Sequence, residues 1–468
     1  MRYISTRGDA PVLGFDDVLL AGLARDGGLY LPETWPRFTT EEIRVMRGLS
    51  YPKLAVRIMS TYVGDAISEG DLTKLATESY REFDHPAVAP LKQLDTSLWF
   101  MELFHGPTLA FKDYAMQFLG RAFDHVLSKR GARITVVGAT SGDTGSAGIE
   151  ACRDREAIDI FMLYPHERVS EVQRRQMTTV DAANVHTLAV EGTFDDCQDL
   201  VKAMFNDMTF RDEMQLSAVN SINWARIMAQ IVYYFHAALA LGAPDTPVRF
   251  SVPSGNFGNA FAAYAAREMG LPVDQLIIGT NENDILTRFF DSGDLAMATV
   301  QRTISPSMDI QLSSNFERLL FDLYDRDGAA LADAMKSFRT EGRLSVGDNR
   351  WKRVCALFNA RRIDDDRTRA EMDRVYRETG DIIDPHSAIG VAAARDARRD
   401  LHIPTIALGA AHPAKFPDAV EAACGAFSPL PSRMADLYDR TEKFTVVPNN
   451  LGHIQAFVRA NAGQGSIT

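Results

Sequence analysis

Short apolar runs and stretches of helical spacing alternate along most of this chain. A short apolar run bounded by turn residues is typical of a buried strand, whereas apolar residues at every third or fourth position indicate a helix. Strands that alternate with helices predict parallel sheets made of βαβ units. The predicted strands are 133–137, 158–164, 185–190, 248–252, 276–279 and 405–408, and helices are predicted at 144–151, 170–180, 195–205 and 258–269.

The same pattern divides the chain into regions. Residues 1–88 carry apolar residues mainly at helical spacing, and a long helical stretch at 222–241 separates two groups of predicted strands. We therefore expect an α/β protein with two open parallel-sheet lobes and a mainly helical N-terminal domain. The predicted domains are 1–88, 89–245 and 246–468, the last with a helical insertion around 285–380.

Length and charge narrow the possible classes of function. The chain has 468 residues, which suits roughly two or three domains. Its net charge of −12 argues against sequence-independent nucleic-acid binding, which needs a basic face. The most apolar stretch, 227–241, is interrupted by Gln230 and His236 and is too short to span a bilayer. We expect neither a nucleic-acid partner nor a membrane.

The cysteines and the N-terminal residues bear on the compartment. The four cysteines form no CxxC pair, so neither a zinc cluster nor a redox dithiol is indicated, and no metal is expected. So few cysteines in so long a chain fit a reducing compartment. Residues 1–15 lack the apolar core of a signal peptide. These features lead us to expect a cytoplasmic protein.

Three glycine-rich turns follow predicted strands, at 138–145, 254–259 and 409–415. Such a turn leaves backbone N–H groups free at a helix N-terminus, where the helix dipole also favours an anion. A single turn is weak support, because strand-to-helix turns need glycine for their geometry alone. Their spacing matches neither GxGxxG nor GxxxxGK[ST]. The three turns together point to a cofactor that carries phosphate but is not a common nucleotide.

A lysine at the expected start of a helix is the main candidate for catalysis. Apolar residues recur at helical spacing after Lys112, so a helix should begin near this residue. The helix dipole and partial burial beside Leu109 and Phe111 would both lower the pKa of its amine. A neutral amine is what Schiff-base chemistry needs. The alternative is a surface lysine whose stem packs on apolar neighbours.

Four segments carry a resemblance to a known family. The sequences ELFHGPTLAFKDYAMQFLG, TSGDTGSA, PSGNFGN and AHPAKFPDAV resemble those of bacterial and fungal threonine synthases in the same order, and the similarity begins at MRYISTRG. Some motifs are shared with the wider group of pyridoxal-phosphate enzymes that resemble the tryptophan synthase β chain. The resemblance implies a fold type II enzyme with pyridoxal 5′-phosphate as cofactor. It would convert O-phospho-L-homoserine and water to L-threonine and phosphate, the last step of threonine biosynthesis.

The resemblance also implies roles for single residues. Lys112 stands where the family holds its cofactor as an internal aldimine, and it is the expected general base. The positions at which the family binds the cofactor phosphate are occupied by Gly255, Asn256, Phe257, Gly258 and Asn259. The positions at which related enzymes hold the substrate carboxylate are occupied by Ser141, Gly142, Asp143 and Thr144.

Two positions depart from the family pattern. Asp143 stands where much of the wider group has Asn, and a carboxylate there would repel the substrate carboxylate. We therefore expect the Asp143 side chain to cap its own helix. Ala410 replaces the hydroxyl residue of the TAHPAKF motif that would contact the pyridine nitrogen. Either another group makes that contact or none does.

The substrate phosphate needs cationic or N–H partners. Arg226, with Asn223 close by in sequence, and Lys415, with His412, are the candidates. Arg226 could instead form a structural ion pair, and His105 and His412 could be structural histidines. The competing functions are another lyase on the same fold, a non-catalytic protein that binds phosphorylated metabolites, and a nucleotide-binding protein. The expected assembly is a monomer or a homodimer.

Overall fold

The computed structural model describes residues 1–140, 142–218, 220–398 and 400–463. Its N-terminal region is mainly helical, as predicted, and α3 and α4 pack on each other and on the helices of the main body. Ser50 and Ser68 precede these two helices, which present their apolar faces inward. The elements are β1 (Tyr3–Ser5), α1 (Phe15–Ala21), β2 (Tyr30–Pro32), α2 (Thr40–Arg44), α3 (Tyr51–Val63), η1 (Gly64–Ala66) and α4 (Glu69–Arg81).

A six-stranded sheet forms the core of one lobe. Its order is β13-β10-β9-β14-β4-β3, and every pair is parallel except β3 with β4. The inner strands are almost wholly buried, which explains their continuous apolar sequences. The strands are β3 (Leu91–Gln93), β4 (Leu98–Glu102), β9 (Val248–Pro253), β10 (Val273–Thr280), β13 (Phe358–Arg362) and β14 (Thr405–Gly409).

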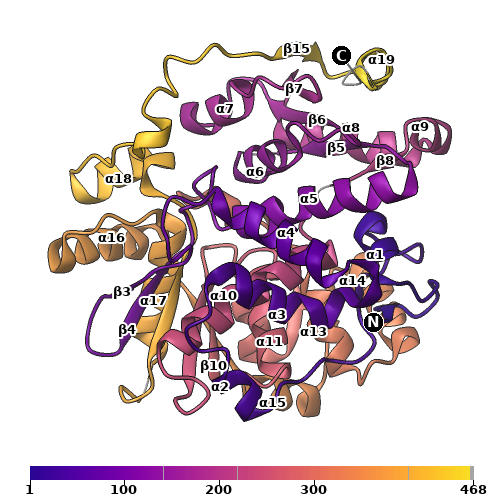
Figure 1. Cartoon of the computed structure of the whole chain (residues 1–468). Coiled ribbons are helices and arrows are strands. Elements are labelled where there is room, and N and C mark those ends of the chain that lie inside the picture. The colour runs from indigo at the N-terminus through magenta and orange to yellow at the C-terminus, as the bar shows by residue number, and fades with distance from the viewer. Residues whose placement is uncertain (141, 219, 399, 464–468) are drawn as a thin grey trace.

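A five-stranded parallel sheet forms the core of the other lobe, in the order β15-β7-β6-β5-β8. This sheet lies at the top of Figure 1, with α6, α7 and α8 beside it. Together the two sheets confirm the predicted fold class of two parallel-sheet lobes. The strands are β5 (Ile134–Ala139), β6 (Ile158–Pro165), β7 (Val185–Glu191), β8 (Leu216–Ser217) and β15 (Thr445–Pro448).

Helices connect the strands and fill the space between the two sheets. α5 packs on α6 of one lobe and on α10, and α10 in turn packs on α11 of the other lobe. Figure 1 shows α5 running between the five-stranded sheet and the rest of the molecule. The helices of this group are α5 (Lys112–Arg130), α6 (Asp143–Cys152), α7 (Glu171–Thr178), α8 (Phe194–Asn206), α9 (Met208–Glu213), α10 (Trp224–Ala240), α11 (Gly258–Glu268) and α17 (Pro385–Ala397).

The predicted insertion and the C-terminal region complete the chain. Residues 285–380 are largely helical, but they also contain a two-stranded sheet and β13, which joins the six-stranded sheet. The remaining elements are α12 (Ile285–Ser292), β11 (Asp294–Ala296), η2 (Pro306–Met308), α13 (Phe316–Leu323), α14 (Gly328–Glu341), β12 (Arg343–Ser345), α15 (Asp348–Cys355), α16 (Asp365–Thr379), η3 (Pro413–Lys415), α18 (Pro417–Cys424), η4 (Ser432–Met434) and α19 (Leu451–Asn461).

Sheet pairing crosses the predicted domain boundaries in two places. β3 and β4 belong to the six-stranded sheet, although residues 89–245 were expected to form a single lobe with the other sheet. β15 pairs with β7 of the five-stranded sheet, although residues 246–468 were expected in the opposite lobe. Local periodicity does not indicate which distant segments pair with each other. The sequence pattern could therefore not predict to which sheet these strands belong. The division into domains itself stays a prediction.

Within the ranges that the structure describes, no helix is long and apolar enough to cross a membrane. The longest apolar helix, α10, is buried over most of its length. Its first residue, Trp224, contacts Tyr3, Trp35 and Tyr62 of the N-terminal region through tilted or edge-on ring pairs. The apolar character of this helix therefore reflects packing inside the protein.

Candidate functional site

A pair of loops positions Lys112 at the first turn of α5. The amide of Phe111 donates to the carbonyl of Ala410 at 2.9 Å, and the amide of His412 donates to the carbonyl of Leu109 at 2.9 Å. These bonds join the loop before α5 to the loop that follows β14. α5 begins at Lys112, which confirms the predicted start of the helix. Because η3 follows the second loop, Lys112 lies close to Lys415.

The turn before Lys112 is held by a buried carboxylate. Asp113 accepts hydrogen bonds from the amide and the hydroxyl of Thr108, at 2.8 and 2.6 Å. Burial raises the pKa of the Asp113 carboxyl to about 6, although the Thr108 hydrogen bonds act against that rise. The carbonyl of Thr108 points away from this bond pair and accepts from Lys415 Nζ at 2.8 Å and from Gln176 Nε2 at 3.1 Å.

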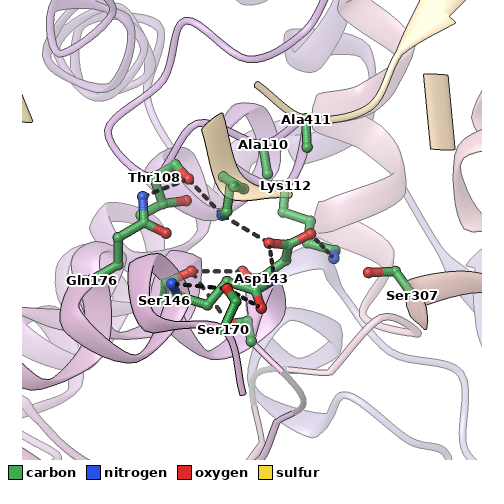
Figure 2. A network of polar contacts seen from close by, with 12 residues as sticks. Thr108, Ala110, Lys112, Asp143, Ser146, Ser170, Gln176, Ser307 and Ala411 are labelled. Atoms are coloured by element: carbon green, nitrogen blue, oxygen red, sulfur yellow. Dashed lines mark hydrogen bonds and ion pairs between the residues drawn. The ribbon is translucent and has the colours of Figure 1, made fainter. Parts of the chain in front are cut away.

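The carboxylate of Asp143 joins two lysines. Its Oδ2 lies 3.5 Å from Lys112 Nζ, and its Oδ1 lies 2.8 Å from Lys415 Nζ. Gln173 Nε2 also donates to Oδ1, at 2.9 Å. Figure 2 shows the Asp143 side chain between Lys112 and the turn that carries Thr108. Asp143 therefore connects the first turn of α6 in one lobe to the lysines that follow strands of the other sheet.

This arrangement corrects the expectation that Asp143 caps its helix. α6 begins at Asp143, and its N-cap residue is Gly142, which has no side chain to cap the helix. An N-cap side chain would bond to the amides of its own helix, whereas both Asp143 oxygens face lysine amines. The tertiary contacts outweigh the local preference, because a buried ammonium group attracts the carboxylate far more strongly than neutral amides do.

The electrostatics of the three groups are coupled. Lys112 is 9% exposed and Lys415 is 0% exposed. Burial lowers the pKa of the Lys112 amine most strongly, Lys415 and Arg226 lower it further, and Asp143 opposes them. Burial would raise the pKa of the Asp143 carboxyl, but Lys415 and Lys112 hold it well below its usual range. The site thus holds an ionised carboxylate beside an amine that tends to be neutral.

The turn that leads into α6 depends on Thr140 and Gly142. Thr140 Oγ1 accepts from the amides of Gly142 and Gly145, at 3.0 and 2.8 Å. Gly142 has a φ of +142°, and a Cβ atom at this position would lie 2.5 Å from the Gln173 side chain. Thr144 is half-buried at the first turn of the helix. Ser141, predicted to contact the substrate carboxylate, lies outside the described residues.

The turn between β9 and α11 leaves a helix N-terminus without a side-chain cap. Phe257 occupies the N-cap position with a φ of +62°, and its ring packs edge-on against Phe316. Asn256 is exposed, and its carbonyl accepts from the amide of Asn315 at 3.1 Å. The first amides of α11, which include those of Gly258 and Asn259, therefore lack a side-chain acceptor and are suited to an anion.

Asn259 has a different environment from the rest of this turn. Its Oδ1 accepts from the hydroxyls of Tyr233 and Tyr234 of α10, at 2.5 and 2.6 Å. The side chain is therefore directed into the interface between α10 and α11. Only its backbone amide remains suited to the predicted cofactor phosphate, together with those of Gly255, Asn256, Phe257 and Gly258.

Arg226 is a buried cation with free donors. It is 3% exposed, and its Nε and Nη1 have no hydrogen-bond partner among the described residues. Burial lowers the pKa of its guanidinium to about 10, which leaves the group charged at neutral pH. No carboxylate in the described part of the chain forms an ion pair with it, so the alternative of a structural ion pair has no support there. Unpaired buried guanidinium nitrogens are costly unless an anionic ligand meets them.

Asn223 and the histidines are engaged within the fold. Asn223 Nδ2 donates to the carbonyl of Leu19 at 2.8 Å, and its Oδ1 accepts from the amide of Ala225 at 2.9 Å. Both ends of this side chain therefore serve the start of α10. His105 Nε2 lies 2.7 Å from Glu102 Oε2, and burial lowers the pKa of His412 to about 4. His412 Nδ1 accepts from the amide of Ala414, which is a capping role.

Three contacts of this site were not predicted from the sequence. Gln173 and Gln176 come from α7, and the third is the backbone carbonyl of Thr108. The two glutamines lie in a predicted helix, but nothing in helical spacing distinguishes a glutamine that reaches a buried carboxylate from a surface one. The carbonyl has no sequence signature, since every residue carries one.

The described residues fit a cofactor that has both an aldehyde and a phosphate. Lys112 offers an amine with a lowered pKa, which is the form that reacts with an aldehyde. The uncapped N-terminus of α11 offers free amides to a phosphate. No cluster of three or more His, Cys, Asp or Glu side chains in residues 1–140, 142–218, 220–398 and 400–463 is arranged to hold a metal ion.

Comparison with known protein families gives a consistent result along the chain. The profile "Threonine synthase N terminus" matches residues 2–80, "Pyridoxal-phosphate dependent enzyme" matches residues 83–347, and "Threonine synthase, C-terminal" matches residues 387–458. The threonine synthase of Pseudomonas aeruginosa is 58% identical over 466 residues, which cover 99% of each chain.

Solved structures show the same relationship. The chain is similar to the pyridoxal-phosphate-bound threonine synthase of Brucella melitensis, with a TM-score of 0.98, 54% identity and coverage of 99% and 100% of the two chains. Yeast threonine synthase aligns with a TM-score of 0.94 and 39% identity over 98% of both chains. These likenesses extend over almost the whole length, and the cofactor of the family is pyridoxal phosphate. The chain therefore belongs to the threonine synthase family of pyridoxal-phosphate-dependent enzymes.

Proposed function

We propose that this chain converts O-phospho-L-homoserine and water to L-threonine and inorganic phosphate. Membership of the threonine synthase family supports this reaction. The observation that carries the proposal is the environment of Lys112, a buried amine with a lowered pKa, 3.5 Å from the carboxylate of Asp143. Arg226, with its two unpaired nitrogens, acts on the same amine electrostatically. A nucleophile and a free cation in one buried place suit a phosphorylated amino acid.

We assign the cofactor to two places in the site. Lys112 bonds covalently to the aldehyde, and the backbone amides of Gly255, Asn256, Phe257, Gly258 and Asn259 hold the phosphate. When bound, pyridoxal phosphate supplies an electron sink for carbanions, which no amino-acid side chain provides. Gly255 and the following residues can hold the phosphate because their turn opens directly into the uncapped N-terminus of α11.

The substrate carboxylate is assigned to the N-terminus of α6. The residues assigned to it are Gly142, Asp143 and Thr144 at the start of this helix. Ser141 stays a prediction from the family resemblance, since it lies outside the described residues. The Asp143 side chain does not oppose this role through an unpaired charge, because its carboxylate forms an ion pair with Lys415 at 2.8 Å. Thr140 Oγ1 already accepts from the amides of Gly142 and Gly145, so the amides of Asp143 and Thr144 are the ones suited to the carboxylate.

The leaving phosphate is assigned to Arg226. Its Nε and Nη1 have no partner among the described residues and can donate to phosphate oxygens without giving up an existing bond. Lys415, Asn223 and His412 were the other candidates. The Lys415 amine and the Asn223 amide are hydrogen-bonded within the fold, and His412 Nδ1 caps η3. Arg226 is therefore the residue that we place on the phosphate.

Proton transfer is assigned to Lys112. Once the substrate amine has displaced it, the neutral amine removes the proton at Cα and later returns a proton on the same face. Burial favours this neutral form. Loss of the proton at Cβ expels phosphate from Cγ, a proton then adds at Cγ, and water adds at Cβ. Burial and the charges of Lys415 and Arg226 favour release of each proton that the Lys112 amine takes up.

The test is product analysis with the purified full chain and pyridoxal phosphate. Incubation with O-phospho-L-homoserine should release phosphate and L-threonine in equal amounts, and Lys112→Ala should abolish both. Phosphate accompanied by a keto acid instead of threonine would indicate a sibling lyase on the same fold. Binding of the substrate without any turnover would indicate a non-catalytic protein that binds phosphorylated metabolites.

We also propose that the protein acts in the cytoplasm and as a monomer or homodimer. The four cysteines are free, with Cys152 and Cys197 buried, which suits a reducing compartment. Cell fractionation tests the compartment, and size-exclusion chromatography with light scattering tests the assembly. A disulfide in the isolated protein would contradict the assignment to the cytoplasm.

A further inference from the structure

Two amines compete for one carboxylate in this site. Lys415 Nζ lies 2.8 Å from Asp143 Oδ1 and donates to the carbonyl of Thr108 at 2.8 Å. Lys112 Nζ has only the longer contact of 3.5 Å to Asp143 Oδ2. Lys415 is 0% exposed, so both of these contacts lie inside the protein. The short contacts belong to Lys415, and the long one belongs to the lysine that must react.

Charge balance decides which amine carries the proton. A buried charge is stable only when it is paired and hydrogen-bonded, and a single carboxylate balances a single ammonium group. Two acceptors at 2.8 Å, one of them a carboxylate oxygen, favour the ammonium form at Lys415. Among the described residues, Asp143 is the carboxylate that forms an ion pair with Lys112, so a second ammonium group there would also face the charges of Lys415 and Arg226.

We propose that Lys415 is a positioning residue. It forms an ion pair with the Asp143 carboxylate and thereby keeps the Lys112 amine neutral and free to react with an aldehyde. This deepens the proposed function and rests on it. The charged groups that act on Lys112 are Asp143 of α6, Lys415 of η3 and Arg226 of α10. Of these three groups, Asp143 favours the ammonium form at Lys112, and Lys415 opposes that influence.

The proposal gives a single physical reason for the residue at position 143 and for the contacts of Lys415. Asp143 can stand where the wider group has Asn because Lys415 neutralises it. Lys415 is in turn unavailable for the substrate phosphate, since its Nζ already contacts Asp143 and Thr108. Removal of Lys415 should therefore change the protonation of Lys112 and not merely weaken phosphate binding.

The experiment measures the protonation of Lys112 directly. The cofactor-free full chain is treated with trace acetic anhydride between about pH 6 and pH 11, and acetylation of Lys112 is quantified by mass spectrometry against the exposed Lys336. The pH midpoint reports the protonation of the amine independently of its accessibility. Lys415→Met should raise the midpoint by about one pH unit or more, which is about a tenfold loss of reactivity below both midpoints.

Further variants separate charge from structure. Lys415→Gln removes the charge but keeps an N–H donor near the Thr108 carbonyl, and it should shift the midpoint in the same direction if Lys415→Met fails to fold. Lys415→Arg retains the charge and should restore the midpoint toward the wild-type value. Lys443→Met, which removes a cation from an exposed ion pair with Asp181, should leave it unchanged.

The proposal would be overturned if the midpoint for Lys112 rises by less than about one pH unit, or falls, in folded Lys415→Met or Lys415→Gln. Circular dichroism establishes that each variant is folded. The labelling experiment needs no O-phosphohomoserine. A result that contradicts the role of Lys415 can therefore be distinguished from failure of the proposed reaction. A purely structural role for Lys415 would lower the unfolding temperature but leave the midpoint in place.

Discussion

Lys415 Nζ lies 2.8 Å from Asp143 Oδ1, although the two residues follow strands of two different sheets. Asp143 begins α6 after β5 of the five-stranded sheet, and Lys415 lies in η3 after β14 of the six-stranded sheet. Ligand sites in parallel α/β folds form at the carboxyl ends of strands. This contact brings two such ends together, so the site depends on both lobes and on their relative position.

Replacement of Arg226 should separate activity from stability. Arg226→Met removes a buried charge whose Nε and Nη1 have no partner among the described residues, so the free energy of unfolding should stay equal or rise by about 1–3 kcal/mol. The KM for O-phosphohomoserine should rise by about tenfold or more because the phosphate loses its cation. Urea unfolding of the cofactor-free chain and steady-state kinetics measure the two effects.

Arg318 is the matched control for Arg226. It is equally buried, but it donates to the carbonyls of Tyr30 and Ile222 and to Asn315. Arg318→Met leaves these acceptors unsatisfied and should lower the free energy of unfolding by about 3 kcal/mol. Equal destabilisation in the two variants would show that Arg226 is also structural, against the role that we assign to it.

Gly142 should tolerate no side chain. Gly142→Ala forces an L-residue to a φ of +142° and places its Cβ 2.5 Å from Gln173, which holds Asp143. We expect a loss of about 1–3 kcal/mol in the free energy of unfolding and a large fall in kcat/KM. Gly425→Ala also has a positive φ but no atom within 4 Å of the new Cβ, so it should cost only about 1 kcal/mol and leave kcat/KM unchanged.

His412 should make stability depend on pH. Burial lowers its pKa in the folded state from 6.5 to about 4, so the unfolded chain binds more protons between these values. This contribution to stability is present above pH 6.5 and is lost as the pH falls toward 4. It amounts to about 2 kcal/mol between pH 7 and pH 5.

The substitution His412→Asn tests this contribution. The amide oxygen of Asn can still accept from the amide of Ala414, but it does not titrate. Urea unfolding at pH 5 and pH 7 should show a pH difference smaller by about 2 kcal/mol in the variant than in the wild type. Substitution of the exposed His402 by Asn serves as the control. An unchanged pH difference in His412→Asn would contradict the buried neutral state of His412.

The sequence predicted the elements that local patterns encode. The strands at β5, β6, β7, β9 and β14 and the start of α5 at Lys112 all follow from short apolar runs and helical spacing. The strand β13 was missed because Phe358–Arg362 holds only two apolar residues, which suit an edge strand with one buried face. The inner strand β4 was also missing from the predicted strands, although Leu98–Glu102 is apolar and mostly buried. Low apolar content therefore explains the loss of β13 but not that of β4.

The relations between distant segments could not be predicted in this way. Asp143 was expected to cap α6 because capping is a local preference, whereas its real partners lie on loops that only the tertiary fold brings near. The same holds for β15 beside β7 and for Gln173 at Asp143. The resemblance indicated which residues matter, and the fold showed which of them contact one another.

The most direct test of the account is borohydride reduction of the purified protein with bound cofactor. The wild type should show an absorbance band at about 410–420 nm that disappears on reduction, and peptide mapping should place the cofactor on Lys112. Lys112→Ala should lack both the band and the adduct. Attachment of the cofactor to Lys415 or to another lysine, or a wild type with no band after reconstitution, would contradict the assignment of Lys112 and with it the proposed mechanism.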